Sequence, residues 1–322
     1  MAVYTRLSAE TLAALVAQYD VGDLVSAKGI AEGVSNSNWL VETTGGAEGN
    51  RFILTMYERR IDVGELPFFL GLLDHLSAAG LPVPRTIHDR AGAASREIDG
   101  KAVALIEFLP GVSVGSPTPA QARAIGAVLA RMHLATRSYG QSRANDLGPD
   151  ASARVLSGHS EGSLGGIGEG LPAMMDEAAR VAAEWPQGLP RGVIHSDLFP
   201  DNVLMLGDEV SGLIDFYFAC EDAMAYDLAV THAAWSFADE GATYRAEVGD
   251  ALMAGYESVR PLEPAERAAL PLLAEGACLR FVSSRAHDWL DTPADALVTR
   301  KDPMDFVRRF ETYRSGGAGL FA

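Results

Sequence analysis

One stretch constrains the fold of this chain more than any other: HSDLFPDNVLMLGDEVSGLIDF, residues 195–216. The short apolar runs GVIH, NVLML and SGLIDF have the length of strands, and Gly207–Asp208 is a turn signal between the last two. The first strand would deliver Asp197 into a loop, while Asn202 begins the following hairpin and Asp215 ends it. We therefore expect three oxygen-bearing side chains to converge at the open end of the hairpin, although up to eighteen residues separate them.

The chain around this stretch has two halves of different character. Before residue 110, apolar alternation and turn signals predict strands at 24–30, 39–43 and 51–56, two more within REIDGKAVALIEFLPG, and helices at 8–19 and 66–80. From Thr118 helices are expected, apart from 192–216, at 118–137, 172–185, 222–238, 243–258, 264–290 and 302–313. The pattern predicts an α+β fold of two lobes. Residues 1–109 would form a five-stranded antiparallel sheet with one packed helix, and residues 110–322 a larger, mostly helical lobe.

Composition narrows the class of protein. The 322 residues are 48% hydrophobic and 21% charged, which is typical of a soluble globular chain, and the net charge of -17 argues against nucleic acid or an anionic membrane as a partner. The start of the chain lacks the pattern of a signal peptide, and no apolar run reaches the ~18 residues of a membrane span. Cys220 and Cys278 have no CxxC spacing, so we expect reduced core thiols in a cytoplasmic protein.

The polar residues of 195–216 suit phosphoryl transfer. Mg²⁺ prefers oxygen ligands and is often held by one or two protein groups together with substrate phosphates, and Asn202 and Asp215 would provide such groups. Asp197 lies five residues before Asn202 and is suited to accept the proton of an attacking hydroxyl. Any single aspartate here also fits a turn or helix cap, and we assign that role to Asp201 and Asp208.

The run VIHSDLFPDNVLM…GLIDF…AYDLAV resembles the core of the aminoglycoside phosphotransferase and choline kinase superfamily, relatives of protein kinases. The resemblance implies a protein-kinase-like two-lobe fold using ATP and Mg²⁺, with Asp197 as catalytic base and Asn202 and Asp215 as metal ligands. It also implies that His195 supports the loop through hydrogen bonds. Asp227 would be either a brace for this loop or a carboxylate favoured by a helix N-terminus, and the sequence leaves both open.

The N-terminal half has counterparts of a nucleotide site. EGVSNSNWLVET lies between two predicted strands, like the nucleotide-binding loop of kinases, but lacks the GxGxxG spacing. The resemblance implies adenine contacts from the backbone of Glu107 and Leu109. Thr55 stands where kinases place a lysine on the third strand. Taken alone, this substitution would fit either an inactive kinase or a kinase in which another cation binds the phosphates. The residues expected to face phosphate are Ser35, Asn36, Ser37 and Asn38.

A narrower resemblance extends over most of the chain. It is similar to the bacterial homoserine kinases of this fold in GIAEGVSNSNWLVET, RFILTMYE, ELPFFLGLLDHLSAAGLPVP, HSDLFPDNVL, GLIDFYFACEDAMAYDLAV and CLRFVSSR. That group resembles this chain in placing threonine after Ile-Leu, so Thr55 does not indicate inactivity. The resemblance implies transfer of phosphate from ATP to the hydroxyl of L-homoserine, a step of threonine biosynthesis.

Homoserine is a zwitterion, so its site needs a cation for the carboxylate and an acid or carbonyls for the ammonium. Arg280 and Arg285 are candidates for the carboxylate, with one as ligand and the other on the surface or in an ion pair. Asp222, beside Glu221, is a candidate for the ammonium or a solvated loop residue. Tyr217 would shape the pocket or belong to the core.

Two alternatives stay open. The chain could be another small-molecule kinase of this fold, acting on an aminoglycoside, a choline-like alcohol or methylthioribose, or a silent nucleotide-binding protein. The retained Asp197, Asn202 and Asp215 argue against the second, because a binding protein needs no base. The glycine-rich segment 157–172 has no G-K-[ST] ending and no preceding strand, so a flexible lid or linker is expected there.

Overall fold

The computed structural model describes residues 5, 7–30, 36–46, 49–58, 62–292 and 300–321. The chain forms two compact units, the first made of Met1–Pro110 with Gly212–Tyr217 and the second of Gly111–Ser211 with Phe218–Ala322. The sequence pattern places all of 110–322 in one lobe. The segment 212–217 instead belongs to the first unit, since its residues make their contacts there.

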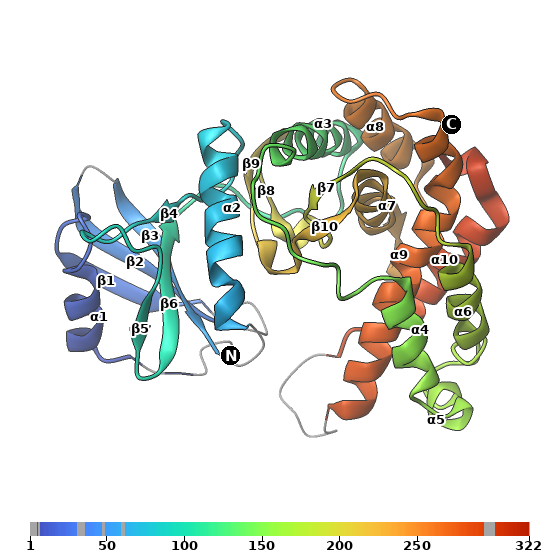
Figure 1. Ribbon diagram of the computed structural model, residues 1–322, viewed down its shortest axis with the longest axis horizontal. Coiled ribbons are helices and arrows are strands. Elements are labelled where there is room, and N and C mark those ends of the chain that lie inside the picture. The colour runs from blue at the N-terminus through green and yellow to red at the C-terminus, as the bar shows by residue number, and fades with distance from the viewer. Residues whose placement is uncertain are drawn as a thin grey trace. The chain divides into compact units, whose positions relative to one another are not determined.

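The first unit is built on a six-stranded antiparallel sheet (Figure 1). Its strands follow the order β1-β2-β3-β6-β4, and β5 also pairs with β6. The sequence pattern predicts five strands and misses β4, because two residues carry no alternation to detect. The strands are β1 (Leu24–Gly29), β2 (Asn36–Gly46), β3 (Gly49–Tyr57), β4 (Thr86–Ile87), β5 (Arg96–Ile98) and β6 (Lys101–Glu107).

Two helices cover opposite faces of this sheet, where the sequence pattern predicts one packed helix. The core that includes Phe52, Leu54 and Met56 of β3 contains the buried residues of α1 (Ala9–Val16). Tyr57, which follows Met56 and therefore points to the other face, packs in the core that contains residues of α2 (Leu66–Ala78). The polar residues on the α2 face of the sheet are thus separated from those on the α1 face.

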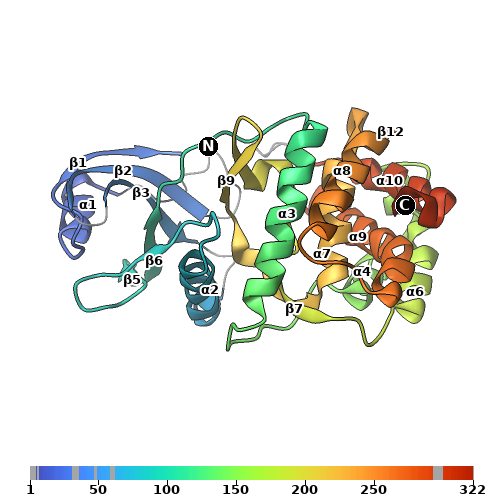
Figure 2. The same cartoon turned by 90° about the horizontal axis from the view of Figure 1, so that it is seen from above.

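The second unit is mostly helical (Figure 1, Figure 2). The predicted helices are confirmed to within a few residues at each end. Its α-helices are α3 (Pro119–Thr136), α4 (Pro149–Ser157), α5 (Glu161–Gly165), α6 (Met174–Glu184), α7 (Met224–Trp235), α8 (Ala246–Glu257), α9 (Pro264–Asp291) and α10 (Met304–Gly316). The chain also has 3-10 turns at η1 (Val63–Glu65), η2 (Pro200–Asn202), η3 (Phe216–Phe218), η4 (Asp239–Gly241) and η5 (Gly317–Phe321).

Helices α3 and α8 lie side by side and approach closely through two glycines (Figure 2). A methyl group on Gly126 of α3 would collide with the backbone oxygen of Leu252 on α8. A methyl group on Gly255 of α8 would collide with the backbone oxygen of Arg123 on α3. Only glycine at both positions permits this separation of the two helix axes.

Short strand pairs support the loops of the second unit. β7 (Arg191–Ile194) pairs with β10 (Cys220–Ala223), and β8 (Val203–Leu206) pairs with β9 (Glu209–Leu213) around Gly207, whose φ is 64°. The remaining pair is β11 (Phe237–Ala238) with β12 (Thr243–Tyr244). The hairpin around Gly207 is therefore confirmed. The helix expected at 222–238 begins two residues later, because Asp222 and Ala223 belong to β10.

The glycine-rich segment 157–172, expected to be a flexible lid or linker, contains a capped helix and two buried leucines. Ser157 ends α4, and Ser160 caps α5 by accepting a hydrogen bond from the backbone N–H of Ser163 at 3.1 Å. Leu164 of α5 and Leu171 are fully buried. No helix within the described residues is both long enough and apolar enough to cross a membrane.

Candidate active site

The loop expected to carry the base follows β7 directly. His195 is buried, and the backbone N–H of Asp197 donates to its Nδ1 at 3.3 Å. Ser196 has a φ of 67°, in the left-handed region that a residue with a side chain rarely adopts. Such a conformation costs on the order of 1–3 kcal/mol and persists only where surrounding contacts fix it.

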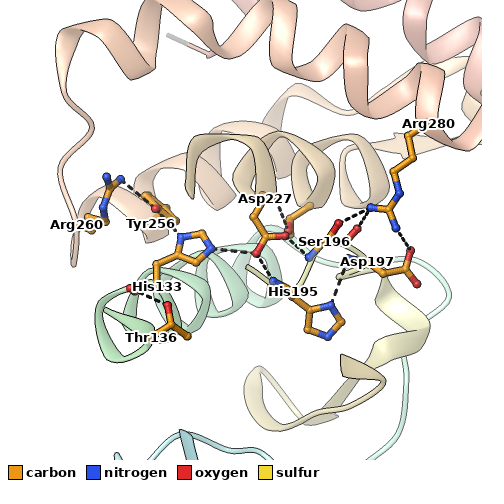
Figure 3. A network of polar contacts seen from close by, with 10 residues as sticks. His133, Thr136, His195, Ser196, Asp197, Asp227, Tyr256, Arg260 and Arg280 are labelled. Carbon is orange, nitrogen blue, oxygen red and sulfur yellow. Dashed lines mark hydrogen bonds and ion pairs between the residues drawn. The ribbon is translucent and has the colours of Figure 1, made fainter. Parts of the chain in front are cut away.

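The first of those contacts comes from Asp227 on α7. Its carboxylate accepts the backbone N–H of His195 at 2.8 Å and that of Ser196 at 2.7 Å (Figure 3). His133 Nε2 lies 3.0 Å from the same carboxylate. Burial by itself raises the pKa of Asp227, but the hydrogen bonds it accepts, above all the one from His133, outweigh burial and lower it. Of the two roles left open for Asp227, the structure shows the brace.

The second set of contacts comes from Arg280 on α9. Its Nη1 donates to the backbone oxygen of Ser196 and, at 2.7 Å, to the Ser196 hydroxyl (Figure 3). Its Nη2 lies 3.9 Å from Asp197 Oδ1, and its Cζ lies over the Phe218 ring, 5.5 Å from the ring centroid. The side chain is only 4% exposed. Arg280, which the sequence indicates for the substrate carboxylate, is therefore already bound to the loop.

Asp197 is oriented from its other side by Asn202. Asn202 Nδ2 donates to the Asp197 backbone oxygen at 2.8 Å and lies 3.2 Å from its carboxylate. Asn202 stands at the end of η2, immediately before β8, and this turn brings its amide back to the loop. The structure thus brings Asp197, Asn202 and His195 together.

Asp215 belongs to the first unit, whereas Asp197 and Asn202 belong to the second. It follows β9 and has a φ of 65°. Tyr57 and Tyr217 lie near it, with their hydroxyls 3.1 Å apart. Burial raises the pKa of Tyr217 to about 12, with a further contribution from the charge of Asp215. The convergence of Asp215 with Asn202 stays a prediction, while Tyr217 is partly buried and packs on Phe69 of α2.

The expected phosphate-facing residues do not form one loop. Ser35 lies outside the described residues, and Asn36, Ser37 and Asn38 are on β2, so the predicted loop was wrong for these three. The strand continues because each pairs with a residue of β3. Asn36 is 6% exposed, and its Oδ1 has no hydrogen-bond partner within the described structure.

Ser37 and Asn38 point to opposite faces of the sheet. Ser37 donates to Glu58 at 2.7 Å, and Glu58 is also paired with Lys101. Asn38 faces the α2 side with Thr55, whose hydroxyl donates to Asn38 Oδ1 at 2.9 Å. The position of the expected kinase lysine therefore holds a neutral hydroxyl–amide pair.

The remaining predicted residues have local partners. Glu107 ends β6 and donates its backbone N–H to the Arg85 carbonyl at 3.0 Å, so that N–H is not available to adenine; Leu109 is half-buried beyond it. Asp222 accepts from Asn145 at 2.7 Å and lies 3.3 Å from Arg191 Nη1. Arg285 Nη1 donates to the backbone oxygen of Asp302 at 2.9 Å and pairs with Asp305 at 3.0 Å.

Sequence reasoning missed a set of buried polar residues behind the loop. His133, Tyr256 and Arg260 connect α3 and the end of α8 to Asp227 (Figure 3). The available signal was a histidine and an arginine within or next to apolar helical runs. That signal is weak, because most such residues only satisfy each other inside a core.

Comparison with known proteins gives a consistent result. Residues 26–262 match the model of the phosphotransferase enzyme family. A homoserine kinase of Gluconacetobacter diazotrophicus is 50% identical over 319 residues, which cover 98% of this chain and 97% of that protein. A homoserine kinase of Caulobacter sp. is 50% identical over 325 residues, covering 99% of this chain and all of that protein.

Solved structures show the same fold at low sequence identity. An amicoumacin kinase in complex with AMP-PNP, Ca²⁺ and Ami has a TM-score of 0.72 at 14% identity, covering 97% of this chain and 94% of its own. A choline kinase from Cryptosporidium parvum has a TM-score of 0.65 at 12% identity, and the match covers 97% of this chain and 96% of that protein. The predicted α+β, protein-kinase-like fold is thus confirmed.

Proposed function

The chain belongs to the phosphotransferase enzyme family, and on that basis we propose that it is a homoserine kinase. It would transfer the γ-phosphate of ATP to the hydroxyl of L-homoserine and form O-phospho-L-homoserine in threonine biosynthesis. The assignment of homoserine as the substrate is supported by sequence identity near 50% with homoserine kinases over almost the full length of both chains. Low-identity structural neighbours support the fold alone.

Asp197 is proposed as the general base. The substrate hydroxyl oxygen would attack the γ-phosphorus while its proton passes to the Asp197 carboxylate and the bond to ADP breaks. Asn202 and Arg280 hold this carboxylate and its loop from two sides. Such assistance typically contributes about 10²–10⁴-fold in rate, and it depends on the fixed position of the base.

Mg²⁺ is proposed to bind Asn202 and Asp215. Because Asn202 Nδ2 is directed to Asp197, its Oδ1 is the atom left to accept a hard cation, and Asp215 adds a carboxylate. When bound, the metal would neutralise charge on the transferring phosphate. Within the described residues, no three His, Cys, Asp or Glu side chains form an alternative metal site.

For ATP, we propose the α2 face of the first unit's sheet. Thr55 and Asn38 lie on that face beside the buried Asn36. The Asn36 amide oxygen has no partner among the described residues, and a buried oxygen of this kind needs a ligand or water to satisfy it. The family resemblance also implies contacts with ATP from four more residues, and these contacts remain proposals: Ser35, Ser37, Glu107 and Leu109.

For homoserine, we propose Arg285 as the better candidate for the carboxylate, since Arg280 already binds Ser196. Arg285 would have to share its guanidinium with Asp305. Asp222, for the ammonium, and Tyr217, for the wall of the pocket, remain proposals, and each also has a partner within the protein. A cytoplasmic location accords with Cys220 and Cys278, which are buried free thiols.

The test of the substrate is an assay of ADP release from Mg-ATP with homoserine, choline, methylthioribose and kanamycin. We expect turnover with homoserine above the ATP-only background. Turnover with another acceptor alone would favour a different small-molecule kinase, and turnover with none would favour a silent nucleotide-binding protein.

The test of the base compares two aspartates of the same loop. Asp197→Asn should nearly abolish turnover and retain nucleotide binding. Asp201→Asn is the matched control, because Asp201 is exposed in the η2 turn next to Asn202, and it should remain active. Normal turnover in Asp197→Asn would remove Asp197 as the base.

A further inference from the structure

A continuous line of buried polar contacts runs from Glu266 of α9 to the loop that carries Asp197, and Figure 3 shows its part from Arg260 onward. Glu266 of α9 accepts from Arg260 Nη2 at 2.8 Å, and Arg260 Nη1 donates to the Tyr256 hydroxyl at 3.1 Å. The same hydroxyl lies 2.8 Å from His133 Nδ1, and His133 Nε2 lies 3.0 Å from Asp227. None of these five side chains is more than 6% exposed.

The direction of each hydrogen bond follows when every buried donor hydrogen in this line is given an acceptor. Arg260 can only donate, so the Tyr256 oxygen accepts from it. The single hydrogen of that hydroxyl is then directed to its other described partner, His133 Nδ1, which accepts it. A ring that accepts at Nδ1 is neutral and carries its hydrogen on Nε2, and that hydrogen is donated to the Asp227 carboxylate.

We propose that Arg260, Tyr256 and His133 form a positioning relay for the catalytic base. The relay holds His133 in the Nε2–H tautomer, which gives Asp227 a third donor beside the backbone N–H groups of His195 and Ser196. A carboxylate fixed in this way holds the left-handed turn at Ser196 and, one residue later, Asp197. The expected effect on kcat rests on the proposed kinase function, whereas the tautomer of His133 does not.

The packing of α3 against α8 positions His133 and Tyr256 next to each other. Gly126 and His133 are seven residues apart, two turns along α3, so they share one face of that helix. Gly255 directly precedes Tyr256 on α8. The close approach that the two glycines permit therefore brings His133 and Tyr256 within hydrogen-bond distance.

The test compares two substitutions that each delete one buried hydroxyl. Tyr256→Phe removes the middle of the relay. Tyr313→Phe is the matched control, because the Tyr313 hydroxyl lies 2.6 Å from His232 Nδ1 and both residues are fully buried. We expect a similar loss of thermal stability in both variants. Only Tyr256→Phe should lower kcat, by about tenfold, with KM for ATP and for homoserine changed less than about twofold.

The second measurement is independent of turnover. Nitrogen-15 spectra of selectively labelled histidine report the tautomer of each ring, and the His133 signals are assigned by their loss in His133→Gln. We expect the Nε2–H tautomer in the parent protein, its loss in Tyr256→Phe and its retention in Tyr313→Phe. A doubly protonated His133 in the parent, an unchanged tautomer in Tyr256→Phe, or equal kcat in the two Phe variants overturns the relay. If the parent does not phosphorylate homoserine, the proposed function fails and the spectra alone decide the relay.

Discussion

Asp227→Asn is the substitution whose effect the structure defines best. The carboxylate accepts three hydrogen bonds, and an amide offers one acceptor oxygen and two donor hydrogens. If the amide oxygen takes the place of Oδ2, it keeps the N–H of His195 and the ring of His133, and its NH₂ group faces the N–H of Ser196. That buried N–H loses its acceptor, which costs about 1–3 kcal/mol. The two retained bonds lose charge assistance, about 1 kcal/mol more.

Relief of carboxylate desolvation does not cancel this loss. The pKa of Asp227 is lowered although the group is fully buried, so its partners stabilise the charge by more than burial destabilises it. We therefore expect Asp227→Asn to reduce the free energy of unfolding by about 3 kcal/mol at pH 7.

The assay is urea unfolding followed by tryptophan fluorescence, since three of the four tryptophans belong to the second unit. Asp208→Asn, an exposed turn residue, should stay within about 0.5 kcal/mol of the parent. Because the folded pKa of Asp227 is below its unfolded value, its contribution is present above about pH 4 and is lost as the pH falls through the folded value. If Asp227→Asn has the same free energy of unfolding as the parent protein at pH 7, the role of Asp227 as a brace for the loop is refuted.

Two further predictions concern other buried groups. Arg280→Lys keeps the charge but not the planar guanidinium, whose Nη1 donates to Ser196 while its Nη2 lies near Asp197, so kcat should fall at least about tenfold while KM for homoserine stays unchanged. A large rise in that KM would identify Arg280 as a substrate ligand instead. His232 is fully buried, and burial lowers its pKa to about 3 from an ordinary value near 6.5. Stability should therefore be lost as the pH falls below about 6.5, by roughly 2 kcal/mol at pH 5, and denaturant titrations at pH 7 and 5 should show a smaller loss in His232→Phe.

The two-domain α+β organisation and the loop and hairpin of the candidate site could be predicted from local sequence patterns, whereas the protein-kinase-like fold was implied by the family resemblance. Apolar periodicity marked the long helices, and the spacing from His195 to Asp215 marked a strand, a loop and a hairpin. Errors arose where pairing partners are distant in the chain. The residues of β10 were expected partly in a helix, although they pair with β7, which ends twenty-six residues before β10 begins.

Side-chain partners were less predictable than positions. Arg280 and Arg285 were recognised as a pair of candidate site arginines, but nothing in their spacing shows that one binds Ser196 and the other Asp305. Both contacts join residues at least twenty positions apart, and they depend on how α9 packs. A residue type and its helix can be predicted from sequence, whereas its partner is decided by tertiary packing.

The left-handed turn at Ser196 explains why the loop needs support from several helices. The strain is on the order of 1–3 kcal/mol, and one net hydrogen bond contributes about 1 kcal/mol, so a single contact could not hold the turn reliably. Asp227 on α7 holds the N–H groups on one side, while Arg280 on α9 holds the carbonyl and hydroxyl on the other. Loosening either side would displace Asp197, while the residues proposed to bind substrate would keep their own contacts. Substitutions at these supports should therefore affect kcat more than KM.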